Sequence, residues 1–400
     1  MIDQAMGCLM LGPRSYTGED TFEIHCHGSP LVLETVLQVC LQEGCRAARP
    51  GEFTLRAFLN GRLDLAQAEA VVDVVRAQTN ASLELAVRQL AGWLGERIEP
   101  LRQDVMGSLA RMEAMVDFVE EDVPAQIDEA TLDQLREAET RIEALLAGAE
   151  HGIVLREGAS LCIAGAPNVG KSSIMNGLLG LERSIVTPVA GTTRDTVEET
   201  VSIGGVPFRA VDTAGMTETP DLVERMGIER SRQSLAAADV TLLVLDGSRP
   251  FGNDDALALE TIEEAARDRD RLRLVVAINK SDLPGVLDRS TIAGRLPDTP
   301  IVESSAITEG GLDTLRTALA QVALGSPRQE YVVGNVRHQE ALRRAAAALV
   351  QARNAYESGV PLDLVSFDVR AAANALGEIT GACVDDELLD RIFRDFCIGK

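Results

Sequence analysis

The sequence is poor in positive charge. Its 38 Lys and Arg residues are outnumbered by 62 Asp and Glu residues, so the formal net charge is −24 at pH 7. A surface of this kind repels phosphate backbones over long distances. The charge balance therefore argues against a protein that binds nucleic acid on its own through a broad basic face. If RNA is involved, a local patch or a partner must supply the positive charge.

Paired cysteines, long apolar runs and a basic N-terminus are also missing. The 7 cysteines form no CxxC pair, which makes a disulfide framework or a zinc knuckle improbable. No apolar run reaches the roughly 18 residues that a membrane span requires. Met1–Leu11 contains neither Lys nor Arg, unlike a signal peptide. These absences favour a reducing cytoplasm as the location.

The first half of the chain predicts a short mixed segment followed by helices. Residues 1–60 contain an alternating strand at Thr21–His27, a helix at Leu31–Leu41 and a loop at Ala48–Phe53. Residues 61–157 are rich in strong helix formers and contain no strand pattern, so we expect the first part of a helical domain.

The second half predicts an α/β domain and then more helices. In residues 158–324, segments with a helical pattern alternate with short β-branched runs, which is typical of a doubly wound, mostly parallel sheet. The expected strands are Ser160–Ala164, Val206–Val211, Asp239–Leu245, Leu272–Ile278 and Pro300–Glu303. Residues 325–400 return to helix, so we expect the α/β domain to be inserted into an all-α helical domain.

A phosphate-binding loop follows the first of these strands. Residues 165–172 read GAPNVGKS, which matches GxxxxGK[ST] between a strand and a helix. Glycines let backbone N–H groups approach phosphates, and the helix N-terminus adds positive potential. Lys171 is expected to reach the β- and γ-phosphate oxygens, and the Ser172 hydroxyl to bind Mg²⁺.

Three further elements occur in the order that a GTPase requires. Residues 212–215 read DTAG at a strand end, where a metal-side Asp and a γ-phosphate-sensing Gly belong. Residues 279–282 read NKSD, and the Asp282 carboxylate can accept both guanine donors, N1–H and N2–H₂. Adenine lacks that pair of donors, so a buried carboxylate left unpaired would reject it. Residues 304–306 read SSA and would reach the guanine O6 edge.

The first switch region should lie between the phosphate loop and DTAG. Residues 191–195 read GTTRD there, and Thr193 is placed to bind Mg²⁺ with GTP present. The residue after DTAG is Met216, whose apolar side chain cannot orient water. Hydrolysis must therefore use another polar residue and another positive charge.

Together with VERMGIER at residues 223–230 and CIGK at residues 397–400, these motifs resemble the MnmE/TrmE family of tRNA-modification GTPases. The similarity extends to YTGED at residues 16–20 and to the stretch from Asn60 to Ala70. CIGK and the second of these stretches are the more specific features, because the GTPase motifs are shared with many families.

The resemblance implies roles for named residues in GTP hydrolysis. Glu224 matches the residue that orients the attacking water and is preferred to Glu218; with Arg194 it is predicted to be catalytic. A K⁺ ion, in place of an arginine finger, would be held by Asn168, Thr187, Val189 and Thr192. The predicted GTP contacts are Asn168, Val169, Gly170, Lys171, Ser172, Ser173, Thr187, Pro188, Val189, Ala190, Gly191, Thr192, Thr193, Asp212, Thr213, Ala214, Gly215, Asn279, Lys280, Asp282, Ser305 and Ala306.

The resemblance also implies a reaction on tRNA. Family members dimerise through an N-terminal folate-binding domain and act with the flavoprotein MnmG (GidA), as a heterotetramer, on C5 of the wobble uridine U34. The one-carbon unit comes from 5-formyl- or 5,10-methylene-tetrahydrofolate. Glu23, Arg62 and Lys400 match positions near the folate, with Cys397 close by. Arg62 stands where a Lys also occurs, which keeps the charge and changes the donor geometry.

Relatives begin with a further αβ segment, so residues 1–60 are expected to form a truncated α+β folate-binding-type domain. Two alternatives remain open at this point. One is a ribosome-assembly GTPase of the Era/EngA type, although those carry a usually basic RNA-binding appendage and the flanks here are helical and acidic. The other is a non-catalytic scaffold that uses GTP only as a switch.

Overall fold

The computed structural model describes residues 1–117, 127–181, 200–210, 235, 237–266, 273–325, 333–394, 396 and 399. The chain forms two compact units. The helical unit comprises Met1–Arg76, Ala86–Leu146 and Val336–Lys400. The α/β unit comprises Ala77–Leu85 and Ala147–Asn335. Each unit is described separately below, and the domain boundaries given above stay a prediction.

The helical unit begins with a small β-hairpin and a helix. Strands β1 (Met6–Met10) and β2 (Thr21–His25) pair antiparallel, with Met6 opposite His25. The strand expected at Thr21–His27 therefore ends at His25, because β1 has no residue before Met6 that pairs with it. Helix α1 (Pro30–Gln42) begins at a proline, whose fixed φ suits the first helical turn.

Helix α2 (Glu52–Leu59) begins inside the segment expected to be a loop. The Glu52 carboxylate accepts the Arg49 backbone N–H at 2.9 Å, which satisfies one donor at the helix start. Gly51 has φ of 66°, and a Cβ there would lie 2.9 Å from both Phe393 Cδ1 and Phe396 Cγ. The turn into α2 therefore requires glycine, both for its backbone and for the space.

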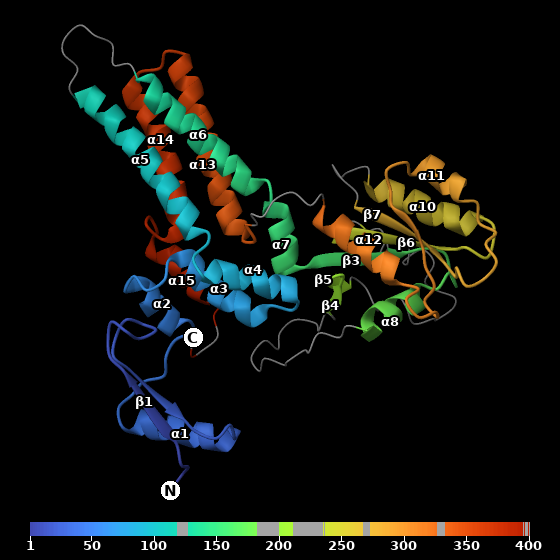
Figure 1. Ribbon diagram of the computed structural model, residues 1–400, viewed down its shortest axis with the longest axis horizontal. Helices are drawn as coiled ribbons and strands as arrows, with labels where there is room; N and C mark the ends of the chain where they lie inside the picture. Colours follow the sequence, from blue (N-terminus) through green and yellow to red (C-terminus); the bar gives the residue numbers. More distant parts are fainter. Residues whose placement is uncertain are drawn as a thin grey trace. The chain divides into compact units, whose positions relative to one another are not determined.

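The remaining helices of this unit come from segments that are far apart in the sequence. The elements are α3 (Leu65–Arg76), α4 (Asn80–Leu90), which continues from the α/β unit, α5 (Gly95–Asp117), α6 (Glu129–Leu146), α13 (Val336–Glu357), α14 (Leu362–Thr380) and α15 (Asp386–Arg394). Four of these helices, α5, α6, α13 and α14, form one bundle, in which α14 packs against α5 and α13, and α6 packs against α13 and α5 (Figure 1). Residues on both sides of the α/β insertion thus share one core, as expected.

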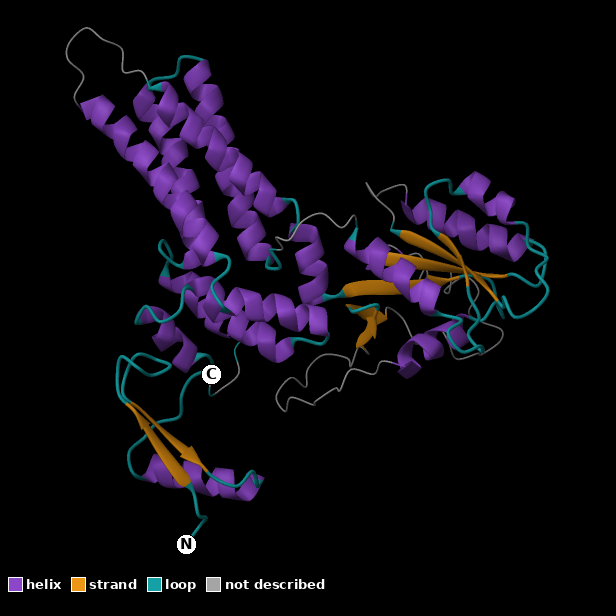
Figure 2. Ribbon diagram, viewed as in Figure 1, coloured by secondary structure: helices purple, strands orange, loops and turns teal. Residues whose placement is uncertain are grey.

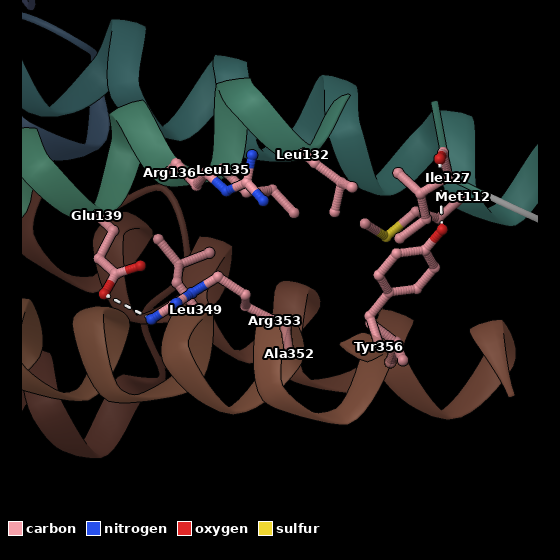
Figure 3. A pocket seen from close by; sticks show the side chains of 11 residues that line it. Met112, Ile127, Leu132, Leu135, Arg136, Glu139, Leu349, Ala352, Arg353 and Tyr356 are labelled. Carbon is pink, nitrogen blue, oxygen red and sulfur yellow. Dashed lines mark hydrogen bonds and ion pairs between the residues drawn. The ribbon is translucent and has the colours of Figure 1, made fainter. Parts of the chain in front are cut away.

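The contact between α6 and α13 combines apolar and polar side chains. In Figure 3, Leu132 and Leu135 of α6 lie opposite Leu349 of α13. At one end of this contact, Glu139 accepts a hydrogen bond from Arg353 at 3.4 Å. The Nε of Arg353 is buried without a partner among the described residues, so only part of this polar edge is paired, whereas the centre of the contact is apolar.

A buried charged cluster joins α3 to the start of α13. Glu69 is 8% exposed and His338 is fully buried. Arg337 donates to both oxygens of Glu69, at 3.0 and 2.6 Å, and His338 Nε2 lies 2.7 Å from Glu69 Oε2. Arg337 also donates to the backbone oxygen of Glu378 at 2.6 Å. The Glu69 carboxylate thus joins α3 to α13, and Arg337 extends the connection to α14.

The α/β unit is built on a mostly parallel sheet of strand order β4-β5-β3-β6-β7-β8 (Figure 2). The strands are β3 (Ala159–Ala164), β4 (Thr200–Ile203), β5 (Val206–Ala210), β6 (Val240–Asp246), β7 (Leu274–Asn279) and β8 (Ile301–Glu303). The five strands expected from the sequence are all present in the described residues. The short β4 was not expected; it pairs antiparallel with β5 at the edge of the sheet.

Helices cover both faces of this sheet. Successive residues of β6 point to opposite faces of the sheet: Leu242 packs into the core on one face and Leu243 into the core on the other. The helices are α7 (Ala149–Glu157), α8 (Lys171–Leu181) and α12 (Asp313–Leu324) over one core, and α10 (Asn253–Ala266) and α11 (Arg289–Arg295) over the other. Strands buried on both faces are characteristic of doubly wound sheets, so the predicted fold class is confirmed.

Across the described parts of both units, no helix is long and apolar enough to span a membrane.

Candidate nucleotide-binding site

The candidate site lies where four strands of the α/β unit end. Strand β3 ends at Ala164, β6 at Asp246, β7 at Asn279 and β8 at Glu303. In doubly wound sheets, ligands bind outside the carboxyl ends of the strands. The loops that follow β3, β7 and β8 carry the GAPNVGKS, NKSD and SSA motifs. The fold therefore brings these motifs to one edge of the sheet.

The backbone of the phosphate loop requires its glycines. Gly165 has φ of 144°, and a Cβ there would lie 2.3 Å from the Val244 backbone oxygen. Gly170 has φ of 100°, and its Cβ would lie 2.3 Å from Asn279 Nδ2. Between them, Asn168 adopts φ of 62°, which asparagine tolerates better than most residues. The loop thus wraps closely against β6 and the NKSD segment, as a phosphate cradle must.

The Lys171 ammonium lies across the phosphate loop. Its Nζ donates to the backbone oxygens of Gly165 and Ala166 at 2.9 and 2.8 Å. Burial lowers the pKa of this amine below its ordinary value. The ammonium is thus held at the loop centre, where it can contact phosphate oxygens.

The first turn of α8 adds polar groups beside the loop. Ser172 and Ser173 are exposed there. The free N–H groups of a helix N-terminus attract anions. Hydroxyl oxygens such as that of Ser172 are suitable ligands for Mg²⁺. The described residues contain no cluster of three or more His, Cys, Asp or Glu that could hold a metal ion.

The NKSD segment is fastened to the phosphate loop through Asn279. Its Nδ2 donates to the Val169 backbone oxygen at 2.9 Å, and the residue is 3% exposed. The Oδ1 of Asn279 and the Oγ of Ser304 are buried without a hydrogen-bond partner among the residues that the structure describes. Val169 itself is fully buried, so the two loops form one rigid assembly.

Asp282 lies at the rim of the same assembly. Its Oδ1 accepts a hydrogen bond from Ser305 Oγ at 2.7 Å, which joins the NKSD and SSA motifs. Ser305 is buried, whereas Asp282 is exposed. From the sequence this carboxylate was expected to be buried; in the structure it is exposed, because it lies in the turn that follows β7. Ala306, the last predicted contact of this loop, is half-buried.

One ion pair at this edge was missed by the sequence argument. Lys280 Nζ lies 2.7 Å from Oδ2 of Asp246, the last residue of β6. Burial raises the pKa of Asp246, but hydrogen bonds from Lys280 and Ser248 outweigh it, so the pKa lies below the ordinary value. The available signal was an acidic residue at the carboxyl end of an otherwise apolar strand.

Many predicted residues lie outside the described part of the chain. This holds for the catalytic pair Glu224 and Arg194, and for the folate-side Lys400 and Cys397. It also holds for Thr187, Pro188, Val189, Ala190, Gly191, Thr192, Thr193, Asp212, Thr213, Ala214 and Gly215. Of the predicted K⁺ ligands, only Asn168 is described, so the K⁺ site and the catalytic roles stay predictions.

The other two predicted folate contacts lie in the helical unit. Glu23 is exposed on β2, with Oε2 3.1 Å from His25 Nε2. Arg62 follows α2 and is exposed; its Cγ lies 3.3 Å from the position that a Cβ on Gly18 would occupy. Gly18 has φ of 79°, so YTGED turns beside Arg62. The folate role of both residues stays a prediction.

Comparisons with known proteins cover nearly the whole chain. The family model described as the MnmE helical domain matches residues 65–397, and that described as the GTP-binding protein TrmE N-terminus matches residues 1–62. The tRNA modification GTPase MnmE of Roseiflexus sp. (strain RS-1) is 47% identical over 411 residues, which span 100% of this chain and 87% of that protein. The tRNA modification GTPase MnmE of Levilactobacillus brevis is 43% identical over 404 residues, spanning 100% and 86%.

Among solved structures, Aquifex aeolicus Era bound to GDP and AlF4⁻ matches with a TM-score of 0.31 and 28% identity, covering 48% of this chain and 66% of that chain.

Proposed function

Because the chain belongs to the MnmE family of tRNA modification GTPases, as the family model over residues 65–397 establishes, we propose that its α/β unit binds GTP between the phosphate loop and the NKSD segment. The enzyme is a GTPase that takes part in tRNA modification. The single observation that supports the binding site best is the hydrogen bond from Asn279 Nδ2 to the Val169 oxygen at 2.9 Å. It fixes the distance between the phosphate-binding and base-binding loops.

Each part of GTP has a matching group on this edge of the sheet. Lys171 and the N-terminus of α8 offer positive potential to the phosphates. Asp282 offers two carboxylate oxygens to the guanine N1–H and N2–H₂ groups. The Ser305 hydroxyl holds that carboxylate at 2.7 Å from the opposite loop. All of these groups lie at the same edge of the sheet, where the strands β3, β7 and β8 end.

The catalytic chemistry is proposed for residues of the switch regions. Glu224 would orient the attacking water, and Arg194 would act beside it. A K⁺ ion held by Asn168, Thr187, Val189 and Thr192 would supply positive charge in the transition state. Mg²⁺ would bind Ser172, Thr193 and phosphate oxygens, with charge neutralisation as its contribution. Asn168 supports the K⁺ proposal, because its φ of 62° places it in the turn of the phosphate loop.

The tRNA reaction follows from family membership together with the match of residues 1–62 to the TrmE N-terminus. We place Glu23, Arg62 and Lys400 near a tetrahydrofolate that carries the one-carbon unit. The reaction would modify C5 of U34 with the flavoprotein MnmG as partner. It would require a homodimer and take place in the cytoplasm. The acidic net charge of −24 fits an enzyme that relies on a partner to hold tRNA.

Family membership favours this proposal over an Era/EngA-type role. A scaffold that only switches on GTP is distinguished by turnover: it would bind GTP and GDP differently but hydrolyse GTP no faster in K⁺ than in Na⁺.

The base-recognition assignment is tested with Asp282→Asn in the full chain. An amide presents one donor and one acceptor to the base. The variant should therefore bind GTP more weakly and xanthosine triphosphate more tightly. We expect GTP affinity to fall by at least about 100-fold, because a site built to pair polar groups discriminates strongly. The measurement is equilibrium binding of both nucleotides.

The matched control is Asp288→Asn. Asp288 caps α11, where it accepts the Ser290 N–H at 2.9 Å, and it is exposed as Asp282 is. It should change neither nucleotide's affinity by more than about twofold, since Asn caps a helix about as well as Asp. Unchanged GTP affinity in Asp282→Asn would refute the assignment.

A further inference from the structure

We infer that Asp246 is a positioning residue for guanine recognition, which it serves by holding the side chain of Lys280 in place. This inference rests on the proposed function, because it concerns the base side of the same GTP site. Asp246 ends β6, and its register partner in the parallel strand β7 is Asn279, the residue before Lys280. The two strand ends therefore present the carboxylate and the lysine side by side.

The Asp246 carboxylate is itself fixed by the backbone. Its Oδ1 accepts the Ser248 N–H at 3.0 Å and the Ser248 hydroxyl at 2.6 Å. Its Oδ2 accepts from Lys280 Nζ at 2.7 Å. The side chain of Asp246 is only 8% exposed, whereas that of Lys280 is 32% exposed. A buried carboxylate that accepts two hydrogen bonds from Ser248 thus anchors a partly exposed lysine.

Lys280 occupies a backbone conformation that needs support. Its φ of 63° is in the left-handed region, and it is one of two such non-glycine residues among those described. This conformation is strained for a residue other than glycine and persists only where the surroundings determine it. The Lys280 oxygen also accepts the Leu283 N–H at 3.0 Å, which closes the turn containing Asp282. The ion pair to Asp246 therefore stabilises the turn from which Asp282 reaches the base.

Holding Lys280 also prepares its apolar stem. Fixing a lysine side chain costs rotamer entropy. Here the ammonium end is already bound to Asp246, so that cost is met on folding rather than on binding. With the ammonium fixed, the methylene groups of Lys280 are the part of the side chain that we expect to contact a planar base. Preorganisation of this kind increases affinity without a new contact to the ligand.

A purely structural role for Asp246 is the competing explanation, and a neighbouring carboxylate provides the comparison. Asp255 is 3% exposed, and its Oδ1 accepts from Arg249 Nη2 at 2.8 Å. Arg249 Nε lies 4.0 Å from Asp246 Oδ2. Asp255 thus belongs to the same polar network, is as buried as Asp246, and has its hydrogen bonds with Arg249 and Gly252 instead of Lys280.

The test uses the full chain with Asp246→Asn, Lys280→Met, the double variant and Asp255→Asn. Equilibrium affinities for GDP and GTP, together with KM and kcat for GTP, are measured for each. We expect Asp246→Asn to lower the affinities for GDP and for GTP by the same factor, about tenfold. KM should rise, while kcat changes by less than about threefold. Lys280→Met should give a similar loss. In the Lys280→Met background, Asp246→Asn should add less than twofold.

Each outcome decides a separate point. Asp255→Asn should leave nucleotide affinity within about twofold, even if it lowers the melting temperature. An equal loss of affinity in Asp255→Asn, or an undiminished effect of Asp246→Asn in the double variant, would show a structural role and overturn the inference. If Asp246→Asn does not fold, Ser248→Ala replaces it: a two- to fourfold weaker GDP affinity supports the inference, and no change overturns it.

A failure of the proposed function gives a different result from a failure of the positioning role. If Asp282→Asn keeps its preference for GTP over xanthosine triphosphate, the base assignment itself is wrong. If Asp282→Asn switches preference while Asp246→Asn binds GTP normally, the base assignment stands and only the positioning role is lost.

Discussion

Replacing Glu69 with Gln should destabilise the helical unit more than any change at its surface charges. The Glu69 carboxylate is the shared acceptor of Arg337 and His338, and it is 8% exposed. Removing one partner of a buried ion pair costs roughly 3–5 kcal/mol. We expect the lower end, about 3 kcal/mol, because Arg337 keeps its hydrogen bond to the Glu378 oxygen. For a unit of this size, that corresponds to a melting temperature lower by about 6–12 °C.

The pH dependence gives a second readout of the same cluster. Burial raises the pKa of Glu69, but the charges and hydrogen bonds of His338 and Arg337 outweigh it and hold the pKa well below its ordinary value. A carboxylate with a depressed folded pKa contributes stability above the ordinary value of about 4.3 and loses it as pH falls further. The stability difference between the wild type and Glu69→Gln should therefore shrink as the pH falls below about 5.

The assay is calorimetric unfolding of the full chain with saturating GDP, which raises the transition of the nucleotide-binding unit and separates it from that of the helical unit. Amide hydrogen exchange in α3 and α13 shows whether the loss of stability is located at these helices. Asp104→Asn is the control, since Asp104 pairs with Arg141 at 2.9 Å and its side chain is 49% exposed. That pair should contribute no more than about 1 kcal/mol. If Glu69→Gln costs no more than Asp104→Asn, the reasoning about buried charge is refuted.

The remaining predictions concern hydrolysis. GTP turnover should be faster in KCl than in NaCl at matched ionic strength, because the loop containing Asn168 would replace an arginine finger by K⁺; equal rates would contradict the K⁺ proposal. Glu224→Ala should leave GTP affinity nearly intact while kcat falls by about 100-fold or more, as expected for a group acting in the transition state. Single-turnover kinetics would measure this loss, and normal turnover in Glu224→Ala with an inactive Glu218→Ala would transfer the role to Glu218.

The strands of the α/β unit and the tight turn of the phosphate loop could be predicted from the sequence where chemistry restricts the residue type. Gly165 and Gly170 leave no space for a Cβ, so the phosphate loop has a recognisable spacing. Strands buried on both faces give continuous apolar runs, which is why β3, β6 and β7 could be located. Strand β4 was overlooked because Thr200–Ile203 is short and pairs only at the edge of the sheet.

Other features could not be read from local sequence because their partners are distant. Glu69 and Arg337 are 268 positions apart, and Asp246 and Lys280 are 34 apart. Each of these residues by itself is an ordinary polar residue. Their roles appear only when the fold places two charges together in a site shielded from water.

The order of segments in the helical unit has a consequence for biosynthesis. Helices α5 and α6 leave the ribosome long before α13 and α14, which complete their core, because residues 147–335 are translated in between. Domains fold as units during synthesis. The α/β unit can therefore close its sheet while the apolar faces of α5 and α6 still await their partners. The helical unit is begun first and finished last, so slow closure of the nascent sheet prolongs the exposure of those faces to chaperones and to aggregation.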